Sequence, residues 1–285
     1  MSCNQCGSAR TRHVFTKFGY DLVECSECGL AYIANPPTPE ALADSYQHEA
    51  NYHDTLLDPT TAEFATMTRV ARTHMDFTAR HAKAGRLLDV GSSTGLFLNE
   101  ARQAGYSVEG VEFSRGSAEF ARSHFGLTVT DGDIHAADAT PNMWDVITMF
   151  DVIEHVPDPT RDMKAVWAML KPGGLFIVST PNIDGLFPRW SLKVAGALDY
   201  WPHPEPPHHL YQFSVRTLSA MLSKTGFKVE GERQINIDLA YSFGTPATLA
   251  KMPKRLAYAA MFAPLAKIGP WIGQGDWFYL AARKG

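Results

Sequence analysis

The sequence predicts an α/β protein built on a doubly wound sheet, with a small metal-binding module at its N-terminus. Two observations lead to this prediction. Residues 86–112 read as an apolar strand, a glycine-containing loop, a helix and a second strand that ends at an acid. The four cysteines of the 285-residue chain form two Cys-x-x-Cys pairs between residues 3 and 28. The remainder of the chain contains no cysteine.

The composition is that of a globular protein that buries a full core, with 45% apolar and 20% charged residues. The formal net charge is −4, so the chain as a whole lacks the basic excess expected of a nucleic-acid-binding protein. No signal-peptide pattern precedes the first cysteine pair, and the longest apolar run, residues 256–266, is too short to span a membrane. We therefore expect a cytoplasmic protein without a transmembrane segment.

The cysteine pairs predict one structural zinc ion, held by Cys3, Cys6, Cys25 and Cys28. Cytosolic thiols stay reduced, which disfavours disulfides. Each pair brings two thiolates to one turn, and two such turns complete a tetrahedral site. A catalytic zinc and a redox role are the alternatives. Four thiolates leave no open coordination position, which favours the structural metal.

We refer to residues 1–35 as the zinc ribbon, and within it bases and acids balance. The bases are Arg10, Arg12 and Lys17, and the acids are Asp21, Glu24 and Glu27. A module that grips phosphates needs a basic excess, so we expect this one to pack on the protein or to cover substrate. Residues 36–84 are predicted to be a helical linker and cap, with helical apolar spacing over residues 61–84.

The glycine-containing loop, Gly91-Ser92-Ser93-Thr94-Gly95, follows the first predicted strand of the core, which carries Asp89 near its end. Glycines at such a place let the backbone approach a ligand at the start of the next helix. Glu112 ends the second strand, where a carboxylate can accept hydrogen bonds from ribose hydroxyls. The G-x-G-x-x-G fingerprint of dinucleotide binding is absent.

These motifs together resemble the class I S-adenosylmethionine-dependent methyltransferases. In that family an acid precedes a G-x-G-x-G loop, and here Ser93 stands at the middle glycine. Later segments match the family in order, among them "WDVITMFDVIEHVPDP" as the fourth strand and its loop. The resemblance implies a seven-stranded Rossmann-like sheet with an antiparallel last strand over residues 85–285, with insertions at about 181–213 and 235–275. The cofactor-binding residues that it implies are Asp89, Gly91, Ser92, Ser93, Gly95, Glu112, Phe113, Asp133, Ile134 and Phe150.

Within the family, the segments "EHVPDP" and "PPHHLYQFS" are similar to those of small-molecule methyltransferases. These include O-methyltransferases of quinone biosynthesis and enzymes of sugar, polysaccharide and natural-product pathways, and some related sugar C-methyltransferases begin with a paired-cysteine zinc module. The resemblance implies methyl transfer to a sugar, a polysaccharide precursor or a secondary metabolite, most simply at oxygen. The alternatives are an RNA or protein methyltransferase that uses the zinc ribbon for recognition, and a binding module without catalysis.

Glu154, His155 and His209 are the candidate catalytic residues. The sulfonium of S-adenosylmethionine is already activated, so the protein must orient the acceptor and remove its proton, for which histidine has a suitable pKa. Glu154 and His155 follow the fourth strand, at the sheet edge where ligands bind. His209 lies in a proline-rich and aromatic insertion. The alternative is that all three have structural roles: Glu154 as an acid at the start of a helix, His155 as a solvated histidine, and His209 as part of a packed loop.

Residues 235–275 form a long, apolar and basic insertion between the last two predicted strands. It suits a lid over the acceptor pocket, a homodimer surface, or an interfacial segment that reaches lipid or a lipid-linked substrate. We favour the lid, because insertions of the family near this edge shape the acceptor site. Pro253 and Pro264 predict that a helix here is limited to about three turns.

Overall fold

The structure, a computed structural model, describes residues 2–38, 40–42, 57–198, 206, 208–236, 243 and 246–285. It divides into two compact units. The ribbon unit consists of Met1–Pro36, Ser179–Met221 and Glu232–Leu280, and the sheet unit consists of Pro37–Val178, Leu222–Gly231 and Ala281–Gly285. The predicted boundaries of a ribbon at 1–35, a cap at 36–84 and a domain at 85–285 stay a prediction.

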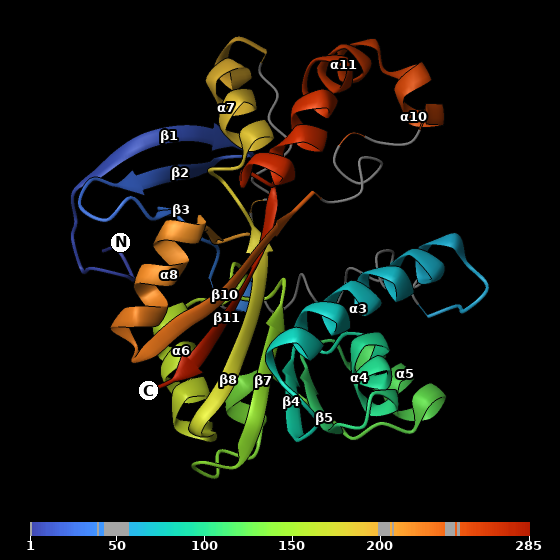
Figure 1. The fold of residues 1–285 in the computed structure, drawn as a ribbon. Coiled ribbons are helices and arrows are strands. Elements are labelled where there is room, and N and C mark those ends of the chain that lie inside the picture. The colour runs from blue at the N-terminus through green and yellow to red at the C-terminus, as the bar shows by residue number, and fades with distance from the viewer. Residues whose placement is uncertain are drawn as a thin grey trace. The chain divides into compact units, whose positions relative to one another are not determined.

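A seven-stranded sheet has the order β10-β11-β8-β7-β4-β5-β6 (Figure 1). The strands are β4 (Arg86–Val90), β5 (Ser107–Glu112), β6 (Val129–Asp131), β7 (Trp144–Phe150), β8 (Leu170–Pro181), β10 (Phe227–Ile235) and β11 (Trp277–Lys284). Strands β4, β5, β6 and β7 are parallel. Strand β11 runs against β8: Asn182 N–H donates to the Asp276 carbonyl at one end, and the Arg283 guanidinium donates to the Gly173 carbonyl at the other. The predicted fold class is confirmed.

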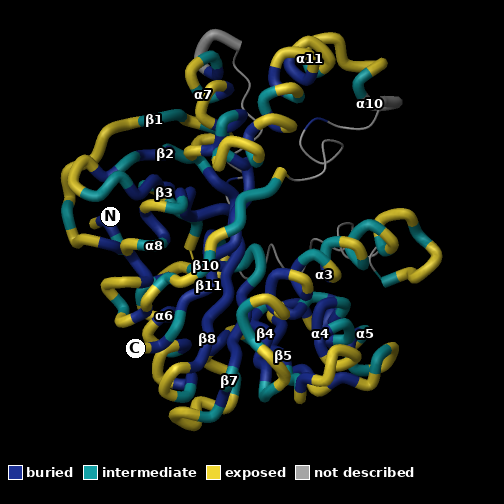
Figure 2. The backbone as a smooth tube through the Cα atoms, in the orientation of Figure 1, coloured by how far each residue is buried: buried dark blue, intermediate teal, exposed yellow. Residues whose placement is uncertain are grey.

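The central strands are buried along their length (Figure 2). Leu87, Leu88, Val146 and Ile147 are at most 2% exposed. Continuous apolar runs of this kind are typical of parallel strands covered on both faces. Strand β8 begins at Leu170, a fully buried residue whose carbonyl accepts from Lys284 Nζ at 2.7 Å.

The helices that belong wholly to the sheet unit are α3 (Ala62–His81), α4 (Leu96–Gln103), α5 (Arg115–Phe125), the short η1 (Ile134–Ala136) and α6 (Pro159–Met169), while α8 (Val215–Lys224) has residues in both units. Helix α3 confirms the predicted helix over 61–84, and the Thr61 hydroxyl caps it by accepting from Phe64 N–H at 3.1 Å. It packs across α4 and α5, since Arg72 Nε lies 3.3 Å from Glu100 Oε1 and the rings of Phe64 and Phe120 are 6.2 Å apart (Figure 1).

The ribbon unit contains a four-stranded sheet of β1 (Thr11–Lys17), β2 (Tyr20–Cys25), β3 (Ala31–Ile33) and β9 (Tyr211–Gln212). Strands β1 and β2 form an antiparallel hairpin between the two cysteine pairs. Its turn places Phe18 and Gly19 at φ 53° and 81°, the left-handed pair of a tight hairpin turn. Strand β9 was not predicted; it joins the sheet through β3, with Tyr32 opposite Tyr211.

The helices of the ribbon unit are α7 (Leu186–Leu198), α10 (Pro246–Lys251), α11 (Pro253–Ile268) and the short η2 (Gly269–Ile272). Helices α7 and α11 share a core of Phe187, Phe243, Tyr258 and Phe262. The predicted limit of three turns is wrong, because α11 continues through Pro264 for 16 residues, about 4.4 turns. Proline removes one helical hydrogen bond, and here its side chain lies on the exposed face of the helix. Among the described helices, none combines the length and apolar character that a bilayer span requires.

Candidate cofactor and metal sites

The predicted cofactor residues lie at or directly after the carboxyl ends of four neighbouring strands of the sheet unit. Asp89 and the loop 91–95 belong to β4, Glu112 and Phe113 to β5, Asp133 and Ile134 to β6, and Phe150 to β7. Because these strands are parallel, their carboxyl ends meet at one edge of the sheet. The structure therefore gathers the predicted set at one edge, while the contact of each residue with a cofactor stays a prediction.

Glu112 links the two loops at this edge. Its Oε2 accepts from Ser93 N–H at 2.7 Å and its Oε1 accepts from Ser114 N–H at 2.7 Å. Burial raises the pKa of Glu112, and these backbone N–H groups act in the opposite direction. The backbone N–H groups of Ser93, Phe113 and Ser114 bond to this carboxylate, which has four acceptor positions, so it can also accept a hydroxyl hydrogen bond. Glu112 thus suits a hydroxyl-bearing ligand such as ribose.

The loop after β4 adopts left-handed backbone conformations at three positions. Ser93 has a φ of 48°, so the serine takes the conformation that the family's glycine would allow, held by its hydrogen bond to Glu112. Gly91 has a φ of 76°, and a Cβ atom there would lie 2.3 Å from Val152 Cγ2. Gly95 has a φ of 79° and is the N-cap residue that precedes α4. Ser92 Oγ is buried and has no hydrogen-bond partner within the described part of the chain, so it can take a further polar partner.

Asp89 lies inside the sheet and is only 3% exposed. Its Oδ1 accepts a hydrogen bond from Thr148 Oγ1 at 2.6 Å, since the register pairs Asp89 of β4 with Thr148 of β7. Burial raises the pKa of Asp89 to about 7, while the hydrogen bond from Thr148 lowers it. This hydrogen bond ties the end of β4, which leads into the loop, to β7. The sequence analysis missed Thr148, which only the register between the two strands could have identified.

An aromatic cluster covers the same edge beside β7. The ring of Phe150 stacks on His74 of α3, with centroids 4.1 Å apart and planes at 4°, and meets Phe97 of α4 edge-on at 4.8 Å. Burial lowers the pKa of His74 to about 3, so this imidazole is neutral near pH ~7. Helix α3 is therefore a cap over this edge. His74 was also missed, although it lies within the predicted helix.

The four cysteines gather in the zinc ribbon. Their sulfur atoms all lie within 4.8 Å of one another, with 3.5 Å between Cys3 and Cys28 and 3.5 Å between Cys6 and Cys25. A tetrahedral zinc with Zn–S bonds of about 2.3 Å places its sulfurs about 3.8 Å apart. The backbone closes both turns in the same way: the N–H of residue 7 donates to the Cys3 carbonyl and that of residue 29 to the Cys25 carbonyl. Donor set and spacing fit a tetrahedral zinc.

The zinc ribbon is tied to the first turn of α8 and to the segment that precedes this helix. Arg216 Nη1 donates to the Cys28 carbonyl at 2.8 Å. Ile33 N–H donates to the Leu210 carbonyl at 2.9 Å, next to the pairing of β3 with β9. His209, 7% exposed, immediately precedes these paired residues. The metal module thus supports the backbone that carries His209.

The other two catalytic candidates belong to the sheet unit. Glu154 and His155 lie in the turn after β7, where His155 N–H donates to the Val152 carbonyl. The Glu154 side chain is 1% exposed and that of His155 is 24% exposed, and His155 Nε2 lies 4.0 Å from Glu154 Oε1. Of the predicted insertion at 181–213, residues 199–205 and 207 lie outside the described residues.

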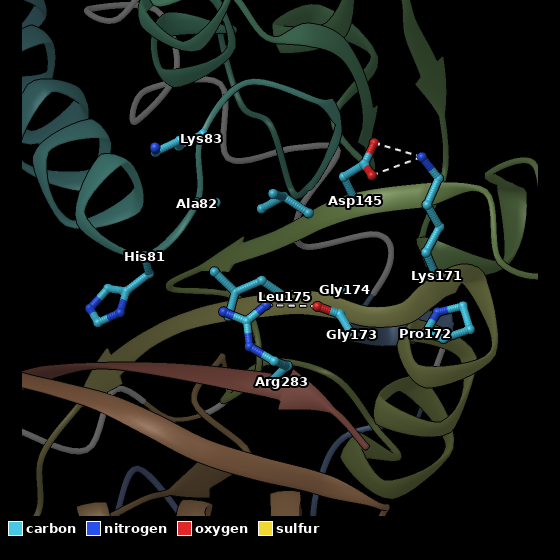
Figure 3. Close-up of a pocket in the computed structure, with 11 residues that line it drawn as sticks. His81, Ala82, Lys83, Asp145, Lys171, Pro172, Gly173, Gly174, Leu175 and Arg283 are labelled. Carbon is cyan, nitrogen blue, oxygen red and sulfur yellow. Dashed lines mark hydrogen bonds and ion pairs between the residues drawn. The ribbon is translucent and has the colours of Figure 1, made fainter.

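A cavity of about 260 Å³ opens at the opposite edge of the sheet unit, near the amino ends of β7 and β8 (Figure 3). Lys171 Nζ lies 2.7 and 2.9 Å from the two Asp145 oxygens, and Arg283 binds both Glu230 and the Gly173 carbonyl. These charges neutralise one another locally, and the glycine loop belongs to the other edge. The cavity is therefore not a candidate for the cofactor site.

Comparison with known proteins identifies relatives of the sheet and its loops. A family model described as a methyltransferase domain matches residues 62–232. A ubiquinone biosynthesis O-methyltransferase of Neisseria meningitidis serogroup C is 33% identical over 148 residues, 48% of this chain and 61% of the relative. The ubiquinone biosynthesis O-methyltransferase of Neisseria meningitidis serogroup A is 31% identical over 180 residues, which are 59% of this chain and 74% of the relative. The enzyme of the same name from Methylococcus capsulatus is 36% identical over 128 residues, which are 42% of this chain and 54% of the relative. The chain thus spans 54–74% of the length of these relatives.

Solved structures share the fold at lower identity. A SAM-dependent methyltransferase from Thermotoga maritima has a TM-score of 0.51 and 20% identity, covering 86% of this chain and 97% of that one. Phosphoethanolamine N-methyltransferase 2 of Haemonchus contortus, in complex with S-adenosylmethionine, has a TM-score of 0.51 and 19% identity, covering 75% and 52%. The cyclase SpnF has a TM-score of 0.56 and 18% identity, covering 87% and 97%. At such identities these structures establish the fold alone.

Proposed function

We propose, because the chain belongs to the methyltransferase domain family, that it transfers a methyl group from S-adenosylmethionine to a small-molecule acceptor. The observation that carries this proposal is the linked pair of loops at the sheet edge, where Glu112 joins the loop 91–95 to the start of α5. Such an edge is where open α/β sheets bind nucleotide-containing ligands. The cofactor supplies an activated methyl group when bound.

The residues proposed to hold the cofactor have distinct tasks. Glu112 would accept the ribose hydroxyls, and the segment Asp133-Ile134 would contact adenine. Within that segment Asp133 Oδ1 accepts from His135 N–H at 2.9 Å, which fixes the short turn η1, and Ile134 is 1% exposed. The backbone of the loop 91–95 would approach the cofactor near the start of α4.

We further propose a hydroxyl acceptor on a sugar, a polysaccharide precursor or a secondary metabolite. Curated relatives named as O-methyltransferases support oxygen as the receiving atom. His155 and His209 are the candidate bases. The buried Glu154 carboxylate, 4.0 Å from His155 Nε2, would stabilise the imidazolium that forms when His155 accepts the acceptor's proton.

A structural zinc belongs to the same proposal. Its four thiolate ligands leave no open position for chemistry, and the ribbon's hydrogen bonds lead to the strand beside His209. A cytoplasmic location, where these thiols stay reduced, is consistent with this role. The expected homodimer stays a prediction.

The test combines product analysis with matched histidine variants. Candidate acceptors are added with labelled S-adenosylmethionine and the product mass is followed. His155→Ala and His209→Ala are then measured separately across pH, with His13→Ala, an exposed ribbon histidine, as the control. Loss of the true base should lower turnover by ~10²–10⁴-fold and remove the acidic limb of the pH–rate profile, while cofactor affinity stays the same.

Two results would count against this assignment. Near-normal turnover in both variants would mean that neither histidine is the base and that the acceptor ionises unaided. Methyl transfer to RNA or protein alone, with every small acceptor inert, would overturn the acceptor class and favour the alternative function.

A further inference from the structure

The helices α7, α10, α11 and η2 of the ribbon unit contain no acidic residue. Residues 186–198 and 246–272 include six bases and no Asp or Glu, in a chain whose net charge is −4. The bases are Arg189, Lys193, Lys251, Lys254, Arg255 and Lys267. A segregated positive charge of this kind favours an anionic partner.

Helix α11 is apolar on two opposite faces. The inner face packs Tyr258, Ala259, Phe262 and Ala266 into the core shared with α7. The outer face exposes a stripe at the helical spacing i, i+4, i+7, i+11. This stripe consists of Ala257, Met261, Pro264 and Ile268. The core covers only the inner face, so the exposed apolar stripe on the outer face indicates a further contact.

The stripe continues into η2 with two of the most exposed apolar side chains of the described structure. Trp271 is 90% exposed and Ile272 is 56% exposed, after Met261 at 58% and Ile268 at 51%. Single exposed apolar residues are ordinary, whereas a run along one helix and its following turn marks an interaction surface.

Lysines border this stripe on the helix. Lys254 lies two turns before Met261, close to the line of the stripe, and Lys267 lies three residues after Pro264 on its other side. Both are exposed. Long lysine stems can lie along an apolar surface while the ammonium group reaches a polar or anionic layer. An apolar stripe with bordering lysines is the pattern of a helix that lies in a bilayer interface.

We infer that this interfacial surface, defined as the outer stripe of α11 with Trp271, Ile272, Lys254 and Lys267, docks on an anionic lipid bilayer. Charge decides between the partners. A second copy of the chain would bring the same acid-free surface against itself across a two-fold axis, with lysines facing lysines. A nucleic acid would match the charge but would leave the apolar stripe uncovered. An anionic bilayer satisfies both features, and no span is required.

The inference concerns membrane association and does not depend on the proposed methyl transfer. The test uses the full chain with zinc and sedimented vesicles of two compositions, phosphatidylcholine alone and equal parts of phosphatidylcholine and phosphatidylglycerol. We expect binding to the anionic vesicles that weakens as salt rises, with a blue shift of the tryptophan fluorescence, to which Trp271 contributes. The double variant Lys254→Gln/Lys267→Gln should weaken binding by about 30-fold.

Matched variants separate the apolar contribution from general surface effects. Trp271→Ser/Ile272→Ser should weaken vesicle binding by ~10-fold or more, because apolar area leaves the bilayer. Phe18→Ser removes another exposed aromatic side chain, 79% exposed and beside a lysine in the ribbon hairpin, and should leave binding unchanged. Melting temperatures of all variants confirm that they fold.

Three outcomes would overturn the inference. The first is that the protein binds neither the phosphatidylcholine vesicles nor the anionic vesicles. The second is binding that both double variants retain. The third is dimerisation without lipid that Trp271→Ser/Ile272→Ser abolishes while vesicles stay unbound, which would assign the surface to a second copy of the chain.

Discussion

Asp89→Asn is expected to remove a pH dependence that the buried carboxyl imposes on stability. The pKa of Asp89 is raised from 3.8 to about 7 by burial, even though Thr148 Oγ1 donates to it at 2.6 Å. A group whose folded pKa exceeds its unfolded pKa stabilises the protein fully below the unfolded value, and this stabilisation is lost as pH rises through the folded value. The two values differ by about 3, so the loss between pH ~4 and ~7 is on the order of 4 kcal/mol.

Urea unfolding of the zinc-loaded protein without cofactor measures this effect at a series of pH values. The free energy of unfolding of the wild type should fall relative to that of Asp89→Asn as pH rises from ~4 to ~7. Above pH ~7 the difference between the two proteins should stay constant. The pKa of His74 is lowered to about 3, so this residue reduces the free energy of unfolding as pH falls, opposite to the effect of Asp89. Both proteins contain His74, and its contribution therefore cancels in the comparison. Thr148→Val removes the hydrogen bond that favours the carboxylate and should move the transition to higher pH.

A pH profile shared by wild type and Asp89→Asn would refute the reasoning. It would mean that the native carboxyl ionises as easily as in the unfolded chain, and that water or a cation reaches it between β4 and β7. In that case Asp89 could not tie β4 to β7 as a buried group.

The remaining predictions concern the cofactor and the metal. Glu112→Ala should weaken S-adenosylmethionine binding in calorimetry by ~1–3 kcal/mol, since it removes a carboxylate that is also bonded to Ser93 and Ser114; equal affinity would place the ribose contact elsewhere. Purified protein should contain near-stoichiometric zinc by elemental analysis, and Cys25→Ser should lower both zinc content and melting temperature; metal-free protein with unchanged melting would end this assignment.

The sequence predicted most accurately where the information is local. Residues 86–112 were expected to form a strand, a loop, a helix and a second strand that ends at Glu112, and β4, α4 and β5 follow in that order, with β5 ending at Glu112. The reason is that buried parallel strands are continuous apolar runs, and glycines mark the turn between strand and helix. The hairpin between the cysteine pairs is also encoded locally, since apolar and polar residues alternate on both sides of Phe18-Gly19.

Features that depend on non-local pairing were missed. Thr148 is a partner of Asp89 only because β4 and β7 pair in one register. His74 reaches Phe150 only because α3 crosses the sheet edge. The two-residue strand β9 has no periodic pattern of its own and exists because β3 offers an open edge. The proline in α11 misled the length prediction, since an exposed position tolerates a missing hydrogen bond.

Strand β9 also gives a physical reason for a metal module in a chain with no other cysteine. A segment of 36 residues buries little apolar surface, and small modules commonly depend on a metal for stability. In our proposal, zinc fixes the two cysteine turns, the turns fix β2 and β3, and β3 fixes residues 210–212 by backbone hydrogen bonds. In this proposal the position of His209 would therefore depend on the metal, although the cysteines would take no part in catalysis. Glu112 and the loop 91–95 belong to the sheet unit and bond to each other, so the cofactor site would not depend on zinc in the same way. In this proposal the ribbon would act on the acceptor side of the reaction, by holding the backbone segment that carries His209 in place.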